Sequence, residues 1–68
     1  MCKGRVKFFN DRKGYGFITG PDCDREIYVH YTAINAEGYR SLAEGQEVLY
    51  ELTIDNNHPA AKNVIPDL

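Results

Sequence analysis

The sequence has two cysteines, no long apolar run and no glycine-rich phosphate-binding loop of the P-loop type. Two cysteines are too few for a disulfide scaffold, and the cysteines and histidines lack the paired spacing of a zinc site, so we expect free thiols, no metal and no cofactor. A membrane span needs about 20 apolar residues. The segment 1–10 does not resemble a secretory signal, whose apolar run has about 7 residues or more. We therefore expect a cytoplasmic protein with no membrane partner.

The length of 68 residues allows one domain, spanning residues 1–68, and the 43% hydrophobic content is too high for a disordered chain. A core of this size hardly supplies the walls of a catalytic cleft. We therefore expect a binding module that is not an enzyme and has no small-molecule substrate.

Charge is unevenly distributed along the chain. The net charge is −2, but residues 1–18 hold five basic residues and one acid, and residues 19–68 hold three basic residues and nine acids. The positive N-terminal part suggests a local face for a polyanion. Ordinary solvated surface charge is the alternative that charge alone leaves open.

Five short segments have the composition of β-strands. They are rich in β-branched and aromatic residues, are separated by turn clusters, and cover residues 5–10, 15–19, 26–31, 47–54 and 61–65. Five strands on short connections predict an all-β fold, a small antiparallel barrel or sandwich. The long connection 32–46 is the exception, with one helical turn predicted near 32–35.

Alternation along the second and third predicted strands separates aliphatic from aromatic side chains. The aliphatic face predicts the core, whose expected members are Val6, Ile18, Ile27, Val29, Ile34, Val48 and Val64. The opposite face carries Tyr15, Phe17, Tyr28 and His30. Without a bulge, one of the consecutive Phe8 and Phe9 also points outward. In a barrel these rings form an aromatic patch that a soluble monomer rarely exposes without a ligand; in a two-layer sandwich they are core.

An exposed aromatic face beside basic residues suits unpaired nucleic acid, because every nucleobase has a π-face on which a ring stacks. Duplex is a poor ligand, since its bases are already stacked and no recognition helix is predicted. A protein-interaction module that docks a peptide or a second copy on the same face is the alternative. A small nuclease ranks third, because no metal-binding carboxylate pair is evident.

The chain resembles the cold-shock domain family in five ordered blocks. These blocks are residues 4–10 (GRVKFFN), 13–18 (KGYGFI), 27–31 (IYVHY), 32–34 (TAI) and 59–64 (PAAKNV). The resemblance implies a five-stranded OB-type barrel that binds single-stranded RNA and DNA with little sequence preference and acts as an RNA chaperone or antiterminator. The binding residues it implies in this sequence are Lys7, Phe8, Asn10, Lys13, Tyr15, Phe17, Tyr28, His30, Tyr31, Tyr39 and Arg40.

The chain departs from the family pattern at four positions. Phe8 stands where the family usually has Trp, Glu26 replaces an Asp, Asn57 stands where a basic residue is common, and His58 where Gly is usual. The smaller ring at position 8 leads us to expect weaker binding in an unchanged mode. We expect a monomer, with a strand-swapped dimer as the alternative.

The remaining expectations concern glycines and cysteines. Gly14 and Gly16 suggest turn flexibility and a close approach of the ligand to a strand without a side chain. If Phe8 faces Phe17 across a ladder, the same register brings the two cysteines opposite each other. We nevertheless expect free thiols, because the turn at residues 20–21 ends that ladder first.

Overall fold

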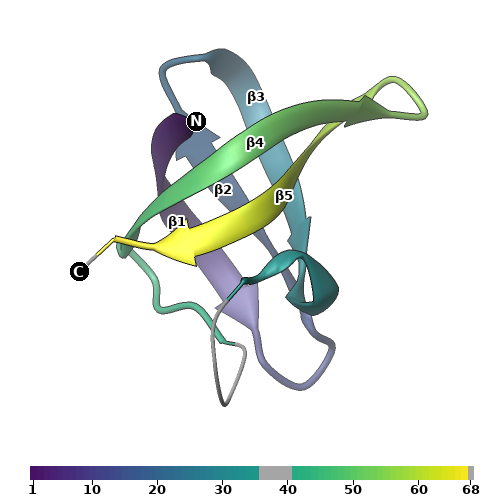
Figure 1. Cartoon of the computed structure of the whole chain (residues 1–68). Coiled ribbons are helices and arrows are strands. Elements are labelled where there is room, and N and C mark those ends of the chain that lie inside the picture. Colours follow the sequence, from purple (N-terminus) through teal and green to yellow (C-terminus); the bar gives the residue numbers. More distant parts are fainter. Residues whose placement is uncertain (36–40, 68) are drawn as a thin grey trace.

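The computed structural model describes residues 1–35 and 41–67 and contains five strands and one short helix in these ranges. The elements are β1 (Cys2–Asn10), β2 (Tyr15–Gly20), β3 (Cys23–His30), the 3-10 helix η1 (Tyr31–Ala33), β4 (Glu47–Asp55) and β5 (His58–Pro66). The strands form a closed barrel in the order β1-β2-β3-β5-β4 (Figure 1). The expected all-β, five-stranded barrel is therefore confirmed, and every strand runs beyond the predicted segment at one end at least. Within the described residues, no helix is long and apolar enough to cross a membrane.

Strand pairing closes the barrel mainly through antiparallel ladders. In the described part of the chain, β1 pairs with β2 and β4, β2 with β3, and β4 with β5, all antiparallel. The β3–β5 contact is parallel and consists of one paired position, Tyr28 with Ala60. The junction between β3 and β5 therefore has the shortest ladder of the barrel. Here β3 and the β4–β5 hairpin lie side by side with few backbone hydrogen bonds between them.

The core lies on the inner face that alternation predicts. All seven expected core residues are at most 2% exposed, so this prediction is confirmed. The structure adds Leu42, Tyr50 and Ala61 to the buried set. Tyr50 is fully buried, and its hydroxyl has no hydrogen-bond partner among the described residues.

Two glycines make room for the Tyr50 ring inside the barrel. A Cβ on Gly4 would lie 3.0 Å from Tyr50 Cε1, and a Cβ on Gly20 would lie 2.6 Å from the Tyr50 hydroxyl oxygen. The two backbones therefore approach the ring more closely than a residue with a side chain allows. Within the described residues, packing and not a hydrogen bond of the hydroxyl therefore holds the Tyr50 ring in place.

We expect Tyr50→Phe to stabilise the domain. An unsatisfied buried hydroxyl costs about 1–3 kcal/mol, so removing it should raise the free energy of unfolding by about 1 kcal/mol in urea denaturation. Burial raises the pKa of Tyr50 above its ordinary value of 10.0. Above that pH the unfolded chain releases a proton that the folded chain keeps, so this residue makes stability fall as pH rises.

The variant should therefore lose less stability than the wild type between pH 9.5 and pH 11.5, roughly the span over which a tyrosine near its ordinary pKa titrates. Tyr28→Phe is the matched control, because Tyr28 is 39% exposed and loses the same hydroxyl from the surface. A destabilised Tyr50→Phe variant would show that the buried hydroxyl does have a partner.

Candidate nucleic-acid interface

Four aromatic side chains form one cluster on the outer face of β1, β2 and β3. We call Phe8, Tyr15, Phe17 and Tyr28 the ring cluster. Phe17 lies at its centre, with ring centroids 5.5 Å from Phe8, 6.3 Å from Tyr15 and 6.1 Å from Tyr28. Tyr15 and Tyr28 stack at 6.0 Å with 24° between their planes. None of the four belongs to the buried core, so the structure favours an outward aromatic face over a sandwich core.

A β-bulge in β1 decides which of the two consecutive phenylalanines points outward. The register with β2 shifts between Val6 and Phe8, so that Val6 pairs with Ile18 but Phe8 pairs with Phe17. Phe8 is 38% exposed, whereas Phe9 packs against the core. The bulge also leaves Lys7 exposed beside Phe8. A cation and a ring thus face the same side of β1, which strict alternation forbids.

His30 and Tyr31 form a second aromatic pair where β3 meets η1. Their ring centroids are 4.6 Å apart with 41° between the planes. His30 Nδ1 accepts a hydrogen bond from the Thr32 backbone N–H at 3.4 Å and lies 2.9 Å from Thr32 Oγ1. These contacts cap η1 and fix the imidazole. Tyr31 is 45% exposed.

The two glycines of the KGYGFI block have different structural roles. Gly14 has a φ of +76°, and a Cβ there would lie 2.7 Å from Tyr31 Cδ1, so the expected turn conformation is present. Gly16 is buried, and a Cβ on it would lie 2.2 Å from the Phe8 carbonyl oxygen. The expectation that Gly16 admits a ligand is therefore wrong, because the backbone of β1 occupies the space that the missing side chain leaves.

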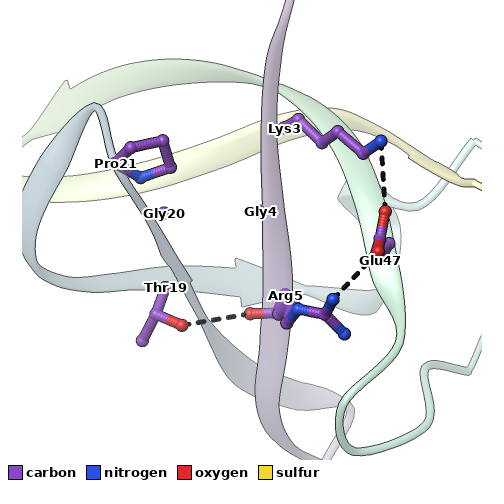
Figure 2. Close-up of a pocket in the computed structure, with 7 residues that line it drawn as sticks. All are labelled: Lys3, Gly4, Arg5, Thr19, Gly20, Pro21 and Glu47. Carbon is purple, nitrogen blue, oxygen red and sulfur yellow. Dashed lines mark hydrogen bonds and ion pairs between the residues drawn. The ribbon is translucent and has the colours of Figure 1, made fainter.

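The basic residues at the start of β1 are paired with acids. Lys3 Nζ lies 3.1 Å from Glu47 and 3.3 Å from Asp67, and Arg5 Nη2 lies 3.0 Å from Glu47. Hydrogen bonding to Glu47 and Asp67 raises the pKa of Lys3. Figure 2 shows both side chains extending toward Glu47 and away from Thr19. These residues line a groove of about 520 Å³. The positive face is thus smaller than the count of basic residues in segment 1–18 suggests.

Of two lysines closer to the ring cluster, Lys7 is paired with an acid, and Lys13 forms no ion pair within the described part of the chain. Lys7 forms an ion pair with Glu26 on β3. Lys13 is exposed, and its backbone N–H donates to Asn10 Oδ1 at 3.0 Å, which gives Asn10 a role in shaping the turn. The other two residues that the resemblance implied, Tyr39 and Arg40, lie outside the described residues.

The two cysteines are free thiols, as expected. Phe8 does pair with Phe17, but the bulge shifts the ladder so that Arg5 pairs with Thr19. Continuing that shifted register does not place the cysteines opposite each other. Partial burial and the nearby Asp22 carboxylate raise the pKa of the Cys2 thiol above its ordinary value of 9.0, which lowers the fraction of reactive thiolate.

The sequence did not reveal a cleft that adjoins the ring cluster. It has a volume of about 330 Å³ and lies between β3 and the β4–β5 hairpin. Its lining residues are Phe17, Glu26, Tyr28, Asp55, Asn56, His58, Pro59 and Ala60. Two of its lining residues, Glu26 and His58, are positions at which the sequence departs from the family pattern, and this was the only sequence feature that pointed to the cleft. The cleft itself forms only when the folded barrel brings the hairpin beside β3.

Comparison with known proteins agrees with this geometry. Residues 2–66 match the family model described as the "Cold-shock" DNA-binding domain. The chain belongs to the cold-shock domain family. It is 49% identical over 63 residues to the Cold shock-like protein CspE of Escherichia coli, with 93% of this chain and 91% of that protein covered. It is also 49% identical over 65 residues to the Cold shock protein CspB of Geobacillus stearothermophilus, covering 96% and 97% of the two chains.

A solved structure supports the fold of this family member. The structure of drosophila Unr CSD456 superposes with a TM-score of 0.81 at 16% sequence identity, covering 98% of this chain and 26% of that one. At this identity the likeness concerns the fold alone. Family membership makes the chain a nucleic-acid-binding cold-shock protein, which is not an enzyme.

Proposed function

We propose that this cold-shock protein binds single-stranded RNA and DNA with little sequence preference by stacking unpaired bases on its aromatic face. The observation that carries the proposal is the arrangement of three outward rings around Phe17 on three adjoining strands. His30 and Tyr31 extend this face at the end of β3. Stacking reads no base-specific atoms, so the mode tolerates sequence variation.

The expected affinity follows from the number of rings. Each base stacked on an aromatic side chain contributes about 1–3 kcal/mol. Three or four such bases give micromolar or tighter binding once the cost of ordering the strand is subtracted. Lys13, and Lys7 once Glu26 releases it, add attraction to phosphates that weakens as salt rises.

Preference for unpaired strands makes the protein an RNA chaperone that needs no ATP, and an antiterminator where the opened hairpin is a terminator. A protein that binds only the open form stabilises it by about 2.7 kcal/mol when its free concentration is a hundred times Kd. That free energy opens hairpins of marginal stability. We place this activity in the cytoplasm and assign it to the monomer, with no small-molecule substrate.

The deciding experiment compares a pyrimidine-rich single strand with its matching duplex. The chain lacks tryptophan, so end-labelled oligonucleotides and fluorescence anisotropy provide the signal. The single strand should bind at least about tenfold more tightly, because a duplex offers no unstacked base. Equal affinity for both ligands would exclude the stacking mode.

The aromatic face also fits a protein-interaction module, since Phe8, Tyr28 and Tyr31 are all exposed. Salt dependence separates the two functions. Binding to nucleic acid weakens steeply between low and physiological salt, whereas an apolar protein interface scarcely responds. Self-association that is insensitive to salt and occludes the oligonucleotide would favour the interaction module.

Removing the carboxylate that pairs with Lys7 should strengthen binding. In Glu26→Gln, Lys7 is free to neutralise a phosphate, and one repulsive charge leaves the edge of the ring cluster. We expect severalfold tighter binding at low salt, with the slope of log K against log salt steeper by about 0.7, the contribution of one phosphate contact on a single strand.

Glu51→Gln is the matched control for this measurement. It removes the same charge from β4, where Glu51 accepts a hydrogen bond from Asn63. An equal gain in both variants would show that net charge alone, and not the release of Lys7, determines the effect.

A further inference from the structure

The cleft between β3 and the β4–β5 hairpin continues the ring cluster into a recess of different chemistry. Phe17 and Tyr28 belong to both, so a strand that stacks on the cluster passes directly beside the recess. Its volume of about 330 Å³ falls at the lower end of the range for small-ligand pockets. A single planar group therefore fits in it.

The hairpin that forms the far wall is held in a defined shape. Asn56 and Asn57 have φ values of 51° and 65°, the left-handed pair that a tight two-residue hairpin turn requires. Arg25 Nη2 donates to the Asn57 carbonyl oxygen at 3.2 Å, which ties the turn to β3. The Tyr28–Ala60 bridge joins the same two walls deeper in the barrel. The β4–β5 turn extends beyond the rest of the barrel (Figure 1).

Charge determines which part of a nucleotide enters the recess. Glu26 and Asp55 both line it, and the uncompensated carboxylate of Asp55 repels a phosphate, so the base and not the backbone faces it. Lys7 pairs with Glu26. Asp55 has no hydrogen bond or ion pair of its side chain within residues 1–35 and 41–67. Its carboxylate is therefore the acceptor available to a base.

An ionised carboxylate only accepts hydrogen bonds, so it discriminates between base edges. Adenine, cytosine and guanine carry an exocyclic amino group that donates to such an acceptor. In the major groove of DNA, Asp and Glu accept a hydrogen bond from the cytosine amino group in this way. Uracil and thymine have no amino group, and the one donor on their pairing edge, the imide N3–H, is flanked by two carbonyl oxygens whose lone pairs repel the carboxylate. Asn56 and His58, also in the lining, supply polar atoms for the rest of the edge.

We propose that this recess selects a base with an amino group from the strand stacked on the ring cluster, and that Asp55 is the specificity-determining residue. The inference rests on the proposed function, because the ring cluster must first hold the strand. The recess would give the protein a base preference at one position of the bound strand, whereas stacking on the ring cluster does not distinguish between bases.

The test scans a single cytosine through heptathymidylate, one position per oligonucleotide, with all-thymine as the reference. We expect one position, or two adjacent ones, at which cytosine tightens binding by about fivefold or more, the lower range of discrimination by a well-placed hydrogen bond. In Asp55→Ala this ratio should fall to about one, while Asp55→Glu should retain part of it. The control Asp24→Ala removes an equal charge from β3 outside the recess lining and should keep the ratio.

A second pair of ligands isolates the amino group from base size. At the selected position, adenine should bind more tightly than purine, which is the same ring system without the amino group, and the difference should vanish in Asp55→Ala. Because the readout is a ratio between ligands, a uniform change in affinity from altered net charge does not affect it.

The outcomes separate the two proposals. Failure of heptathymidylate to bind the wild type overturns the proposed function. Binding of heptathymidylate with no position that favours cytosine, or a preference that persists in Asp55→Ala, overturns the recess proposal alone. Far-UV circular dichroism establishes that the variant is folded; if it is not, the wild-type scan and the adenine–purine comparison decide the question.

Discussion

Replacing Phe17 and His30 together by alanine should abolish most of the affinity for single strands while leaving the barrel folded. Each ring stacks one base, and each stacked base contributes about 1–3 kcal/mol. The double variant should therefore lose about 2–6 kcal/mol of binding free energy, at least about a thirtyfold increase in Kd. Anisotropy titration with a pyrimidine-rich strand measures the loss directly.

The fold should survive this double change because neither side chain belongs to the buried core. Phe17 contacts only other rings of the cluster in the aromatic pairs of the described residues. The double change removes four aromatic pairs, and at about 0.5 kcal/mol each, the lower end of the range for such pairs, stability falls by about 2 kcal/mol. The far-UV spectrum at low temperature should therefore be kept. Ile54→Ala is the control, since Ile54 is 61% exposed and lies outside the ring cluster.

Two results would contradict the stacking role. Unchanged affinity in the folded double variant would mean that the rings do not touch the ligand. Loss of the far-UV spectrum together with binding would mean that the rings support the barrel instead. Measuring each single variant as well shows whether the two losses add, as expected for two rings that stack different bases.

Much of the aromatic face was predictable because it depends on local alternation. The side chains of Phe17 and Tyr28 on one face, and of Ile18 and Val29 on the other, follow from the period of two in single strands. A closed barrel then requires the aliphatic face to be inside. The buried core and the outward rings could therefore be read from short segments, without knowledge of how distant segments meet.

The features that escaped prediction depend on contacts between segments far apart in the sequence. The bulge that exposes both Lys7 and Phe8 arises from the fit of β1 to β2 and leaves no mark in residues 5–10 alone. Glu47, which pairs with Lys3 and Arg5, lies more than forty residues further along the chain. Asp55 reaches the aromatic face only because β3 and β5 meet at one bridge.

Gly16→Ala should unfold the domain, because among the described glycines this position leaves the least room for an added methyl group. The new Cβ would lie 2.2 Å from the Phe8 carbonyl oxygen and 2.7 Å from Phe9 Cα. Both are backbone atoms of β1, and Gly16 pairs with Phe9 in the ladder. The clash is therefore relieved only by separating β1 from β2, and not by a side-chain rotation.

The cost combines two contributions. Overpacking a tight site costs about 1–3 kcal/mol, and each ladder hydrogen bond lost as the strands separate costs about 1 kcal/mol more. A domain of this size rarely has more than about 3–5 kcal/mol of stability. The variant should thus be largely unfolded at 37 °C, a typical physiological temperature, as measured by thermal circular dichroism.

Gly45→Ala is the matched control, because no atom of the described residues other than its chain neighbours lies within 4 Å of a Cβ placed on Gly45. Its φ of +83° makes alanine strained by about 1–2 kcal/mol, so this variant should be weakened but folded, and should still bind. The comparison also decides between the two roles considered for Gly16. If Gly16→Ala folds with normal stability and loses only its affinity for single strands, the missing side chain serves the ligand. If it unfolds, the missing side chain serves the contact between β1 and β2, and the ring cluster depends on it, since that contact places Phe8 against Phe17.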